Sequence, residues 1–309
     1  MRVTNSMSVL KHTNAIQNNL QNLSKVNEKL STMKNINKLS DDPYNAIKVL
    51  NMNNEISTTE KYEKNCNEAT GWLDTTDSSL DTLGNLIKNI KETLVSAGNG
   101  AYSDDEMKSL SIKINETMKE IANVLNSTHG GKYIFGGSET GEQPVIIEEI
   151  TDPKTGNSRV ELKINPNIDQ KKLDEGLNIS IAQGIDIEYN VKLSDIIPEF
   201  GDLNDISSAL AKRDEQSIKD LTTTHLGKIE NIFEKMLSTR STYGIKANTV
   251  ESMQKKNEED LVQIKETLSK TQDVDFTTAI MELKQAELVY TASIQTGSKL
   301  MQNSILNYL

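Results

Sequence analysis

Few residues of this 309-residue chain have the types and spacing that chemistry requires. The three histidines, His12, His129 and His225, lie far apart, and none belongs to a zinc-binding H-E-x-x-H pattern. We interpret them as solvated or helix-end residues rather than catalytic ones. The single cysteine, Cys66, excludes an intramolecular disulfide and a thiolate metal cluster. Because it lies on a helical apolar stripe, it is predicted to be a small buried side chain rather than a nucleophile.

The sequence motifs of common enzymes are also missing. There is no G-x-S-x-G, no G-x-G-x-x-G and no phosphate-binding P-loop. Acidic pairs such as Asp41-Asp42 are typical of helix caps rather than of acid–base catalysis. An enzyme carried by residues 140–201 remains an alternative, but this segment contains no histidine or cysteine. The sequence therefore predicts a protein that is not an enzyme and that binds no cofactor or metal.

Composition and charge exclude further classes of function. The formal net charge is −11, whereas nucleic-acid binding needs clustered excess lysine and arginine. No apolar run approaches the roughly 18 residues of a membrane span, so we expect no membrane insertion. The first residues contain no continuous apolar segment and do not resemble a cleavable secretory signal. The chain is predicted to be cytoplasmic or to be exported by a route without such a signal.

Helical periodicity dominates both ends of the chain. An N-terminal amphipathic helix is predicted to end near residues 39–43, where Pro43 suits the first turn of the next helix. That second helix keeps a heptad pattern from Tyr62 to Leu94 and is predicted to end at Gly98. A third helix follows over 107–125. The stripe of the first helix consists of Ile16, Leu20, Leu23, Val26, Leu30 and Met33.

The middle of the chain has a different pattern. Residues 145–192 show the period-two alternation and β-branched runs of strands, with turn residues at 152–156. Helical patterns return near Leu203, and a heptad pattern runs from Tyr243 to Thr271 with an interruption by the polar residues Gln254 and Asn257. Asp275 is a candidate cap for a last helix. The stripe of that helix consists of Ile280, Leu283, Tyr290, Ile294, Met301 and Ile305.

These patterns predict a mainly α protein with a small β insertion. The economical arrangement pairs the N- and C-terminal helices in an elongated antiparallel coiled-coil bundle, because a heptad stripe needs a partner. Three parts are expected. Residues 1–40 and 276–309 form a terminal coiled coil, residues 41–139 and 202–275 form the long bundle, and residues 140–201 form an inserted β-rich domain.

Two features exceed what a simple bundle needs. The segment HGGKYIFGG places three exposed-looking apolar residues, Tyr133, Ile134 and Phe135, between glycine pairs, although a short strand closing the bundle would explain it equally. The terminal stripes are the second feature, because two helices alone bury little apolar surface. We therefore expect them to bind outside partners. The candidate interface residues are Ile16, Leu20, Leu23, Leu30, Ile280, Leu283, Tyr290, Ile294, Met301 and Ile305.

Three segments carry a resemblance to a known family. NINKLSDDPYNAIKVL, NEATGWLDTTDSSLDTL and FTTAIMELKQAELVYTASIQTGSKLMQNSILNYL resemble the ends of bacterial flagellins and their relatives. HGGKYIFGGSET and the short β insertion resemble the flagellar hook–filament junction proteins, the hook-associated protein 3 or FlgL type, more than flagellin itself. One departure is Lys34-Asn35-Ile36, where relatives commonly have a run similar to Gly-Lys-Arg-Ile.

The resemblance implies a function outside the cell, in the bacterial flagellum. In this family the terminal segments form an inner coiled-coil layer between subunits, and the β domain faces outward. Export through the flagellar type III apparatus needs no cleaved signal peptide. The implied partners are further copies in a junction ring or helix, a hook-side junction protein, flagellin, and an export chaperone that binds the C-terminal helix. The implied role is mechanical adaptation between hook and filament.

Two other functions remain open. A flagellin filament subunit belongs to the same class, but YIFGG and the modest β insertion favour the junction protein. A secreted coiled-coil effector or adhesin would use its heptads on a host helix, and it would not need a flagellin-like pattern at both ends.

Overall fold

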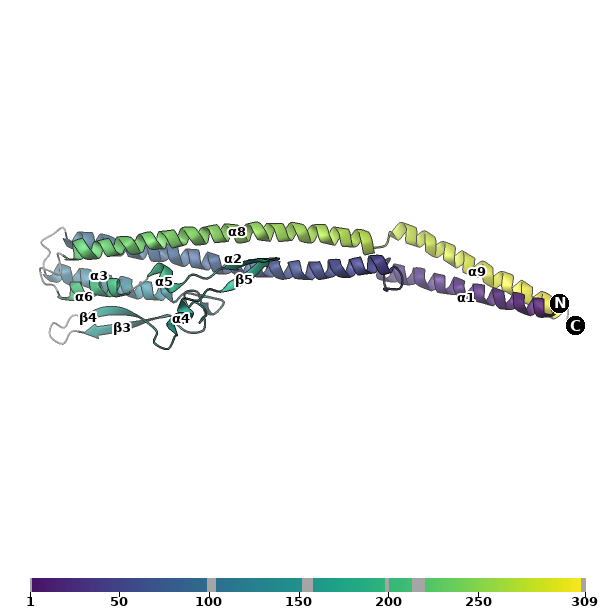
Figure 1. The fold of residues 1–309 in the computed structure, drawn as a ribbon, viewed down its shortest axis with the longest axis horizontal. Helices are drawn as coiled ribbons and strands as arrows, with labels where there is room; N and C mark the ends of the chain where they lie inside the picture. Colours follow the sequence, from purple (N-terminus) through teal and green to yellow (C-terminus); the bar gives the residue numbers. More distant parts are fainter. Residues whose placement is uncertain (1, 99–103, 152–157, 198–199, 213–219, 307–309) are drawn as a thin grey trace. The chain divides into compact units, whose positions relative to one another are not determined.

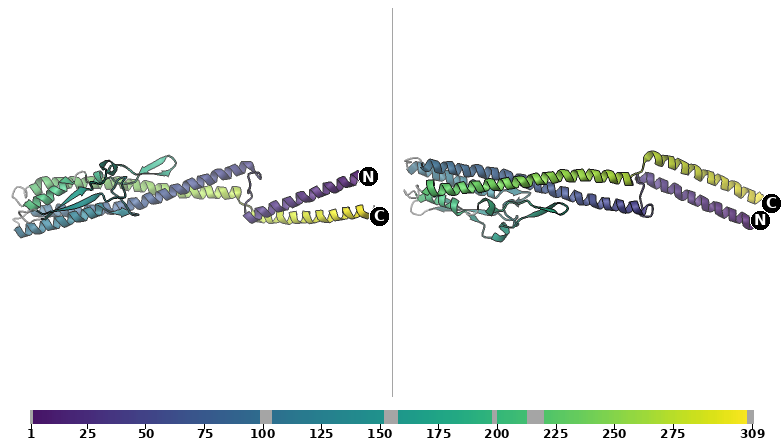
Figure 2. Two further views of the ribbon diagram at one scale, coloured as in Figure 1. Left: turned by 90° about the horizontal axis from the view of Figure 1, so that it is seen from below. Right: turned by 45° about the horizontal axis from the view of Figure 1, so that its top comes forward.

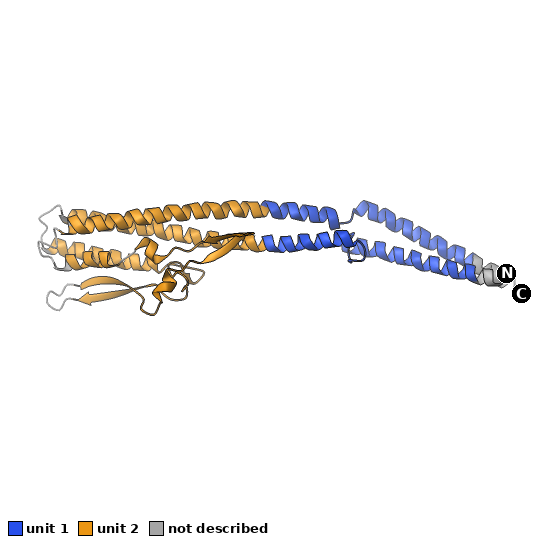
Figure 3. Cartoon of the chain, viewed as in Figure 1, with its two compact units in different colours: residues 1–59, 259–309 blue, residues 60–258 orange. Residues whose placement is uncertain are grey.

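A computed structural model describes residues 2–98, 104–151, 158–197, 200–212 and 220–306 of the chain. Within these ranges it describes no side chains for residues 2–6, 98, 104, 211–212, 222 and 300–306. The chain divides into two compact units. Unit 1 consists of residues 1–59 and 259–309, and unit 2 consists of residues 60–258 (Figure 3).

Long helices make up most of the described chain (Figure 1). Pro43 begins the second helix, as predicted, because its fixed φ suits the first helical turn. The π-helical turn η1 leads directly into α8. Shorter helices lie in unit 2. The helices are α1 (Arg2–Thr32), α2 (Pro43–Gly98), α3 (Asp104–Leu125), α4 (Gln170–Leu173), α5 (Leu193–Ile196), α6 (Gly201–Lys212), η1 (Leu221–His225), α8 (Leu226–Gln272) and α9 (Phe276–Leu306).

The described strands form three antiparallel hairpins, all in unit 2. In the longest, the register runs from Val145 opposite Ile164 to Thr151 opposite Ser158. The third hairpin contains an irregularity between Ser180 and Ala182. The hairpins are β1 (Thr128–His129) with β2 (Lys132–Tyr133), β3 (Val145–Thr151) with β4 (Ser158–Ile164), and β5 (Asn178–Ala182) with β6 (Ile185–Glu188).

Unit 2 has one continuous hydrophobic core. The apolar heptad positions of α2 from Cys66 to Leu94 lie in it, as predicted, and α3, α6 and α8 contribute further apolar side chains. The β hairpins share this core through Val160, Leu162 and Ile181. On the surface, Arg240 of α8 forms ion pairs with Asp77 and Asp81 of α2, at 2.8 and 2.5 Å. Helices and strands of unit 2 therefore stabilise one another.

The second half of the glycine-rich segment lies in this core rather than on the surface. Ile134 and Phe135 are completely buried, so the expectation of exposed apolar residues there is wrong for these two positions. A short strand is present, as the alternative expected, because Lys132 and Tyr133 of β2 pair with β1, but Ile134 and Phe135 follow it in a turn. Gly137 has a φ of 62°, and an added Cβ would clash with the backbone oxygen of Lys172. Only glycine fits this turn without strain.

Unit 1 contains far less buried apolar surface. Its core cluster consists of Ile36, Ala46 and Val49, with Leu268 of α8 packed against it. The first turns of α2 thus pack on the end of α8. Met33 lies beyond α1 with a φ of 57° and is half-exposed, so the apolar stripe of this helix ends at Leu30 and not at Met33.

The observed fold confirms the prediction of a mainly α chain with long terminal helices and a small antiparallel β insertion. The division into three parts stays a prediction, since the compact units follow different boundaries. In the described part of the chain, no helix has the length and apolar character needed to cross a bilayer.

Candidate assembly surface

The terminal helices α1 and α9 of unit 1 pack side by side and antiparallel (Figure 2). Both use a seam with alternating steps of three and four residues, which is the spacing of a coiled coil. The helices are thus paired as predicted. The seam positions of α1 are Val9, His12, Ile16, Asn19, Leu23, Val26 and Leu30, and those of α9 are Ala279, Leu283, Ala286, Tyr290, Ser293 and Gly297.

Polar side chains fix the register of this seam. The ring Nε2 of His12 donates to the backbone oxygen of Ser293 at 2.9 Å, and Asn19 donates to the Ser293 hydroxyl at 2.7 Å. A Cβ at Gly297 would lie 2.8 Å from His12 Nε2, so this glycine allows the close approach. The expectation that His12 is a solvated or helix-end residue is therefore wrong, because it packs in mid-helix between α1 and α9.

Replacing Gly297 with leucine should loosen the α1–α9 pair. The larger side chain would displace His12 from its hydrogen bond, and overpacking of this kind costs about 1–3 kcal/mol. We expect the amides of α1 to exchange with solvent faster. Gly244→Leu is a matched control in mid-helix, since nothing lies within 4 Å of an added Cβ there. Equal exchange rates in both variants would contradict this role of Gly297.

The ten predicted interface residues fall into three groups. Five lie partly buried at the seam: Ile16, Leu23, Leu30, Leu283 and Tyr290. Three are exposed beside it: Leu20 by 48%, Ile280 by 38% and Ile294 by 45%. The side chains of Met301 and Ile305 lie outside the described residues. The predicted stripe of α9 therefore combines part of the internal seam with part of a free flank.

A second free face of α9 escaped the sequence analysis. Met281 and Leu288, exposed by 61 and 71%, lie on the side of the helix opposite the seam. Gln285 and Ala292 are exposed on the same side. Met281 and Leu288 are one heptad apart, and this spacing could have revealed the face. We call these four residues the outer face of α9.

The first turns of α2 present another unpredicted apolar group. Tyr44, Ile47 and Leu50 are exposed by 79, 54 and 57%, on a side of α2 that faces away from Ala46 and Val49. Their spacing of three residues was the available signal, but the heptad pattern of this helix begins only at Tyr62. We call Tyr44, Ile47 and Leu50 the α2 patch.

Exposed apolar side chains are concentrated in unit 1. Among the described residues, 21 large hydrophobic side chains are exposed, and 15 of them belong to this unit although unit 2 is larger. Single exposed apolar residues are normal, but such a concentration is typical of an interaction surface. The six in unit 2 are Val95, Ile112, Ile147, Ile185, Leu237 and Ile245.

Backbone hydrogen bonds join the segment that follows α1 to the segment between α8 and α9. Asn35 donates to Gln272 at 2.7 Å and Val274 donates to Met33 at 3.0 Å. Asp275 caps α9, as predicted. A hydrogen bond from the Thr278 hydroxyl, and others from the backbone of Thr277 and Thr278, lower the pKa of its carboxyl. The start of α9 is therefore held against the end of α1.

The linker between α1 and α2 is folded back on α1. Lys38 forms an ion pair with Glu28 at 2.8 Å, and this carboxylate raises the pKa of the Lys38 ammonium. Asp42 accepts from the backbone of Asn45 at 3.1 Å and so caps α2, as predicted for this acidic pair. Asp41 instead accepts from the backbone of Lys38 at 2.9 Å. A polar pocket of about 310 Å³ lies beside these residues.

The remaining candidates for chemistry lie in unit 2. Cys66 is completely buried against Asn257, and burial raises the pKa of its thiol, as expected for a structural side chain. His129 is hydrogen-bonded to Thr75 at 2.8 Å. His225 lies partly buried in the π-helical turn, where burial lowers the pKa of its imidazole. Among described residues, no three histidine, cysteine or acidic side chains form a group able to hold a metal.

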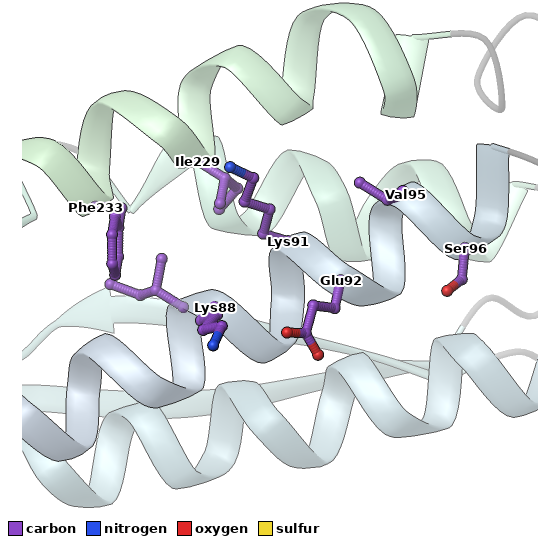
Figure 4. Close-up of a pocket in the computed structure, with 8 residues that line it drawn as sticks. Lys88, Lys91, Glu92, Val95, Ser96, Ile229 and Phe233 are labelled. Atoms are coloured by element: carbon purple, nitrogen blue, oxygen red, sulfur yellow. The ribbon is translucent and has the colours of Figure 1, made fainter.

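A pocket of about 590 Å³ lies between α2 and α8 in unit 2 (Figure 4). Its apolar lining comes from Ile87, Val95, Ile229 and Phe233. Lys91 beside it forms an ion pair with Glu230 at 2.8 Å. None of its described lining residues is a histidine or cysteine, so these residues bring together no nucleophile and imidazole.

Two family models match the chain. The model of the bacterial flagellin N-terminal helical region matches residues 3–140, and that of the C-terminal helical region matches residues 226–309. Together they cover more than two thirds of the chain. They include α1, α2 and α3 at one end and α8 and α9 at the other, so both helices of the candidate assembly surface lie within them.

Flagellar proteins of several bacteria are similar to this chain in sequence. Flagellar hook-associated protein 3 of Salmonella typhimurium is 30% identical over 145 residues, which are 47% of this chain and 46% of that protein. The Escherichia coli protein of the same name is 30% identical over 150 residues, 48% and 47% of the two chains. The chain thus matches about half the length of these relatives. The flagellar filament 41 kDa core protein of Borreliella burgdorferi is 24% identical over 290 residues, 85% of each chain.

Solved structures share the fold. A flagellar hook-associated protein from Vibrio parahaemolyticus has a TM-score of 0.63 at 18% identity, over 75% of this chain and 100% of that one. FlgL of Bacillus cereus has a TM-score of 0.54 at 18% identity, over 71% and 99%. With both terminal helical regions matched by the family models and the fold shared with hook-associated proteins, the chain belongs to the bacterial flagellin family.

Proposed function

We propose that this chain is a structural subunit of the bacterial flagellum that forms the junction between hook and filament and adapts one to the other. The concentration of exposed apolar side chains in unit 1 is the observation that carries the proposal. It falls most heavily on α9, which has apolar side chains at its seam, on its Ile280–Ile294 flank and on its outer face. A helix with apolar side chains on all sides is typical of one buried among several neighbours.

The proposal extends to the parts of the chain and their partners. Residues 1–40 and 276–309 form the inner assembly layer, residues 41–139 and 202–275 form the bundle, and residues 140–201 face outward. Further copies, a hook-side junction protein and flagellin contact the assembled subunit outside the cell. Before export, without a cleaved signal peptide, a chaperone covers α9. This role is mechanical and requires no catalytic group.

A filament subunit is the second candidate function. The similarity to the filament core protein of Borreliella burgdorferi favours it, because that alignment runs through 85% of both chains. The junction role has the support of the sequence similarity to hook-associated protein 3 and of the fold shared with FlgL of Bacillus cereus.

A gold label separates these two functions. Gln183, in the exposed turn between β5 and β6, can be replaced by cysteine and labelled with maleimide-gold, while the native Cys66 is completely buried. We expect electron micrographs of isolated flagella to show gold in one short band between hook and filament. Gold along the whole filament would favour the filament subunit, and native flagella are the control for background labelling.

A further inference from the structure

The outer face of α9 and the α2 patch have properties that suit them to each other. Both are exposed, and both lie on a side of their helix that faces away from its partner within the chain. Met281 and Leu288 offer apolar surface to the three apolar side chains of the α2 patch. The polar groups also match, because the Tyr44 hydroxyl and the Gln285 amide can each donate and accept a hydrogen bond.

The charges beside the two surfaces are complementary. Lys48 follows Ile47 in the α2 patch, and Glu282 follows Met281 on the outer face. Among the described residues, neither Lys48 nor Glu282 has an ion-pair partner. Each charged residue comes one position after an apolar residue of its own surface. Lys48 therefore borders the α2 patch on the same side as Glu282 borders the outer face, when each helix is viewed from its N-terminus. Equivalent flanks face each other when two helices pack antiparallel, and charges there select the partner and its direction.

An antiparallel register that places Glu282 opposite Lys48 also brings two further pairs of residues level. Counted along the helices from this pair, Leu50 comes level with Met281 and Tyr44 with Gln285. Each match holds to within one residue, which is about 1.5 Å along a helix axis. Leu50 therefore meets Met281, and the tyrosine hydroxyl meets the amide, in the same register that pairs the charges.

The size of the α2 patch indicates the kind of partner. Each of its three side chains is more than half exposed, and together they offer on the order of 400 Å² of apolar surface. A stable pair of proteins needs about 800 Å² from each partner. This contact alone would not hold a dimer in solution. It would contribute within an array in which every subunit touches several others.

We propose that the outer face of α9 in one copy docks antiparallel on the α2 patch of a second copy, with Glu282 against Lys48. The contact is heterologous, since each copy offers one surface to one neighbour and the other surface to another. Such contacts form rings or helices rather than closed pairs. The inference rests on the proposed self-assembly and adds the identity of the partner surface, which is a second copy of this chain.

Charge reversal tests the proposed ion pair in flagella on cells. Lys48→Glu and Glu282→Lys should each reduce the number of filaments per cell at least about fivefold, because like charges then oppose each other at the contact. The double variant should restore near-normal filament numbers. Lys256→Glu, a reversal on the exposed face of α8 in unit 2, is the matched control and should have no effect. Failure of the double variant to recover would overturn the inference.

Cross-linking tests which copies meet. Cells should co-express one chain with Leu50→Cys and one with Met281→Cys, and their isolated flagella should be treated with a short bis-maleimide. We expect a cross-linked dimer only when both variants are present, and none from the native chain, whose Cys66 is buried. Dimers from the Leu50→Cys chain alone would indicate a symmetric contact and overturn the inference, as would no dimer at all. The gold label on Gln183→Cys reports independently where the chain lies in the flagellum. If the Leu50–Met281 cross-link forms but the gold lies along the whole filament, only the junction role is refuted.

Discussion

Cells that carry Ile280→Asp and Ile294→Asp together are expected to assemble hooks without filaments. Both residues are exposed on the flank of α9, by 38 and 45%, so the soluble chain should unfold in urea as the native chain does. In an assembled flagellum this flank would be covered, and an unpaired buried charge costs several kcal/mol. A loss of about 3 kcal/mol per contact corresponds to a weakening of more than about a hundredfold. Electron microscopy of cells and swimming assays measure the result.

Two control variants make this result interpretable. Ile245→Asp places the same charge on an α8 side chain that is 66% exposed in unit 2, and it should leave swimming unchanged. Ile280→Leu with Ile294→Leu keeps the flank apolar and should also swim. If the double aspartate variant grows filaments of normal length, the assembly role of α9 is wrong. The same variant should fail to bind the export chaperone, which a binding assay with the purified chaperone would measure.

Replacing Gly137 with alanine is expected to destabilise unit 2 by about 3 kcal/mol. Its φ of 62° is unfavourable for alanine, and the new Cβ would clash with the backbone oxygens of Lys172 and Leu173, the second at 2.6 Å. Backbone atoms do not move aside as the end of a flexible side chain does, so the turn must shift. Since Ile134 and Phe135 precede this turn in the core, the damage should reach the whole unit. Urea unfolding followed by circular dichroism measures it.

Gly131 supplies the matched control for this substitution. Its φ of 80° is also left-handed, but nothing lies within 4 Å of an added Cβ. Gly131→Ala should therefore show the conformational cost alone, about 1 kcal/mol. Equal destabilisation by the two substitutions would mean that the contact with α4 at Lys172 and Leu173 has no importance for the turn.

The sequence by itself determined the long helices, the strands between residues 145 and 192, and the resemblance to the family. Heptad spacing is a local property, so a stripe repeated over several turns indicates a helix before its partner is known. The strand segments alternate in the same local way, and Pro43 and Asp275 mark helix starts through their own backbone chemistry. The prediction that the terminal helices need partners also came from sequence, because two narrow stripes bury too little surface.

Only the tertiary structure decided which stripe is used within the chain. α9 contains more apolar residues than one seam can bury, so Leu283 and Tyr290 could be separated from the free Ile280 and Ile294 only once α1 was in place. The prediction of a solvated or helix-end position for His12 was wrong because its hydrogen-bond partner, Ser293, lies 281 residues away in the sequence. The same reason applies to the glycine-rich segment before Gly137. Burial depends on distant segments that pack over a residue, and spacing along one helix or strand does not reveal them.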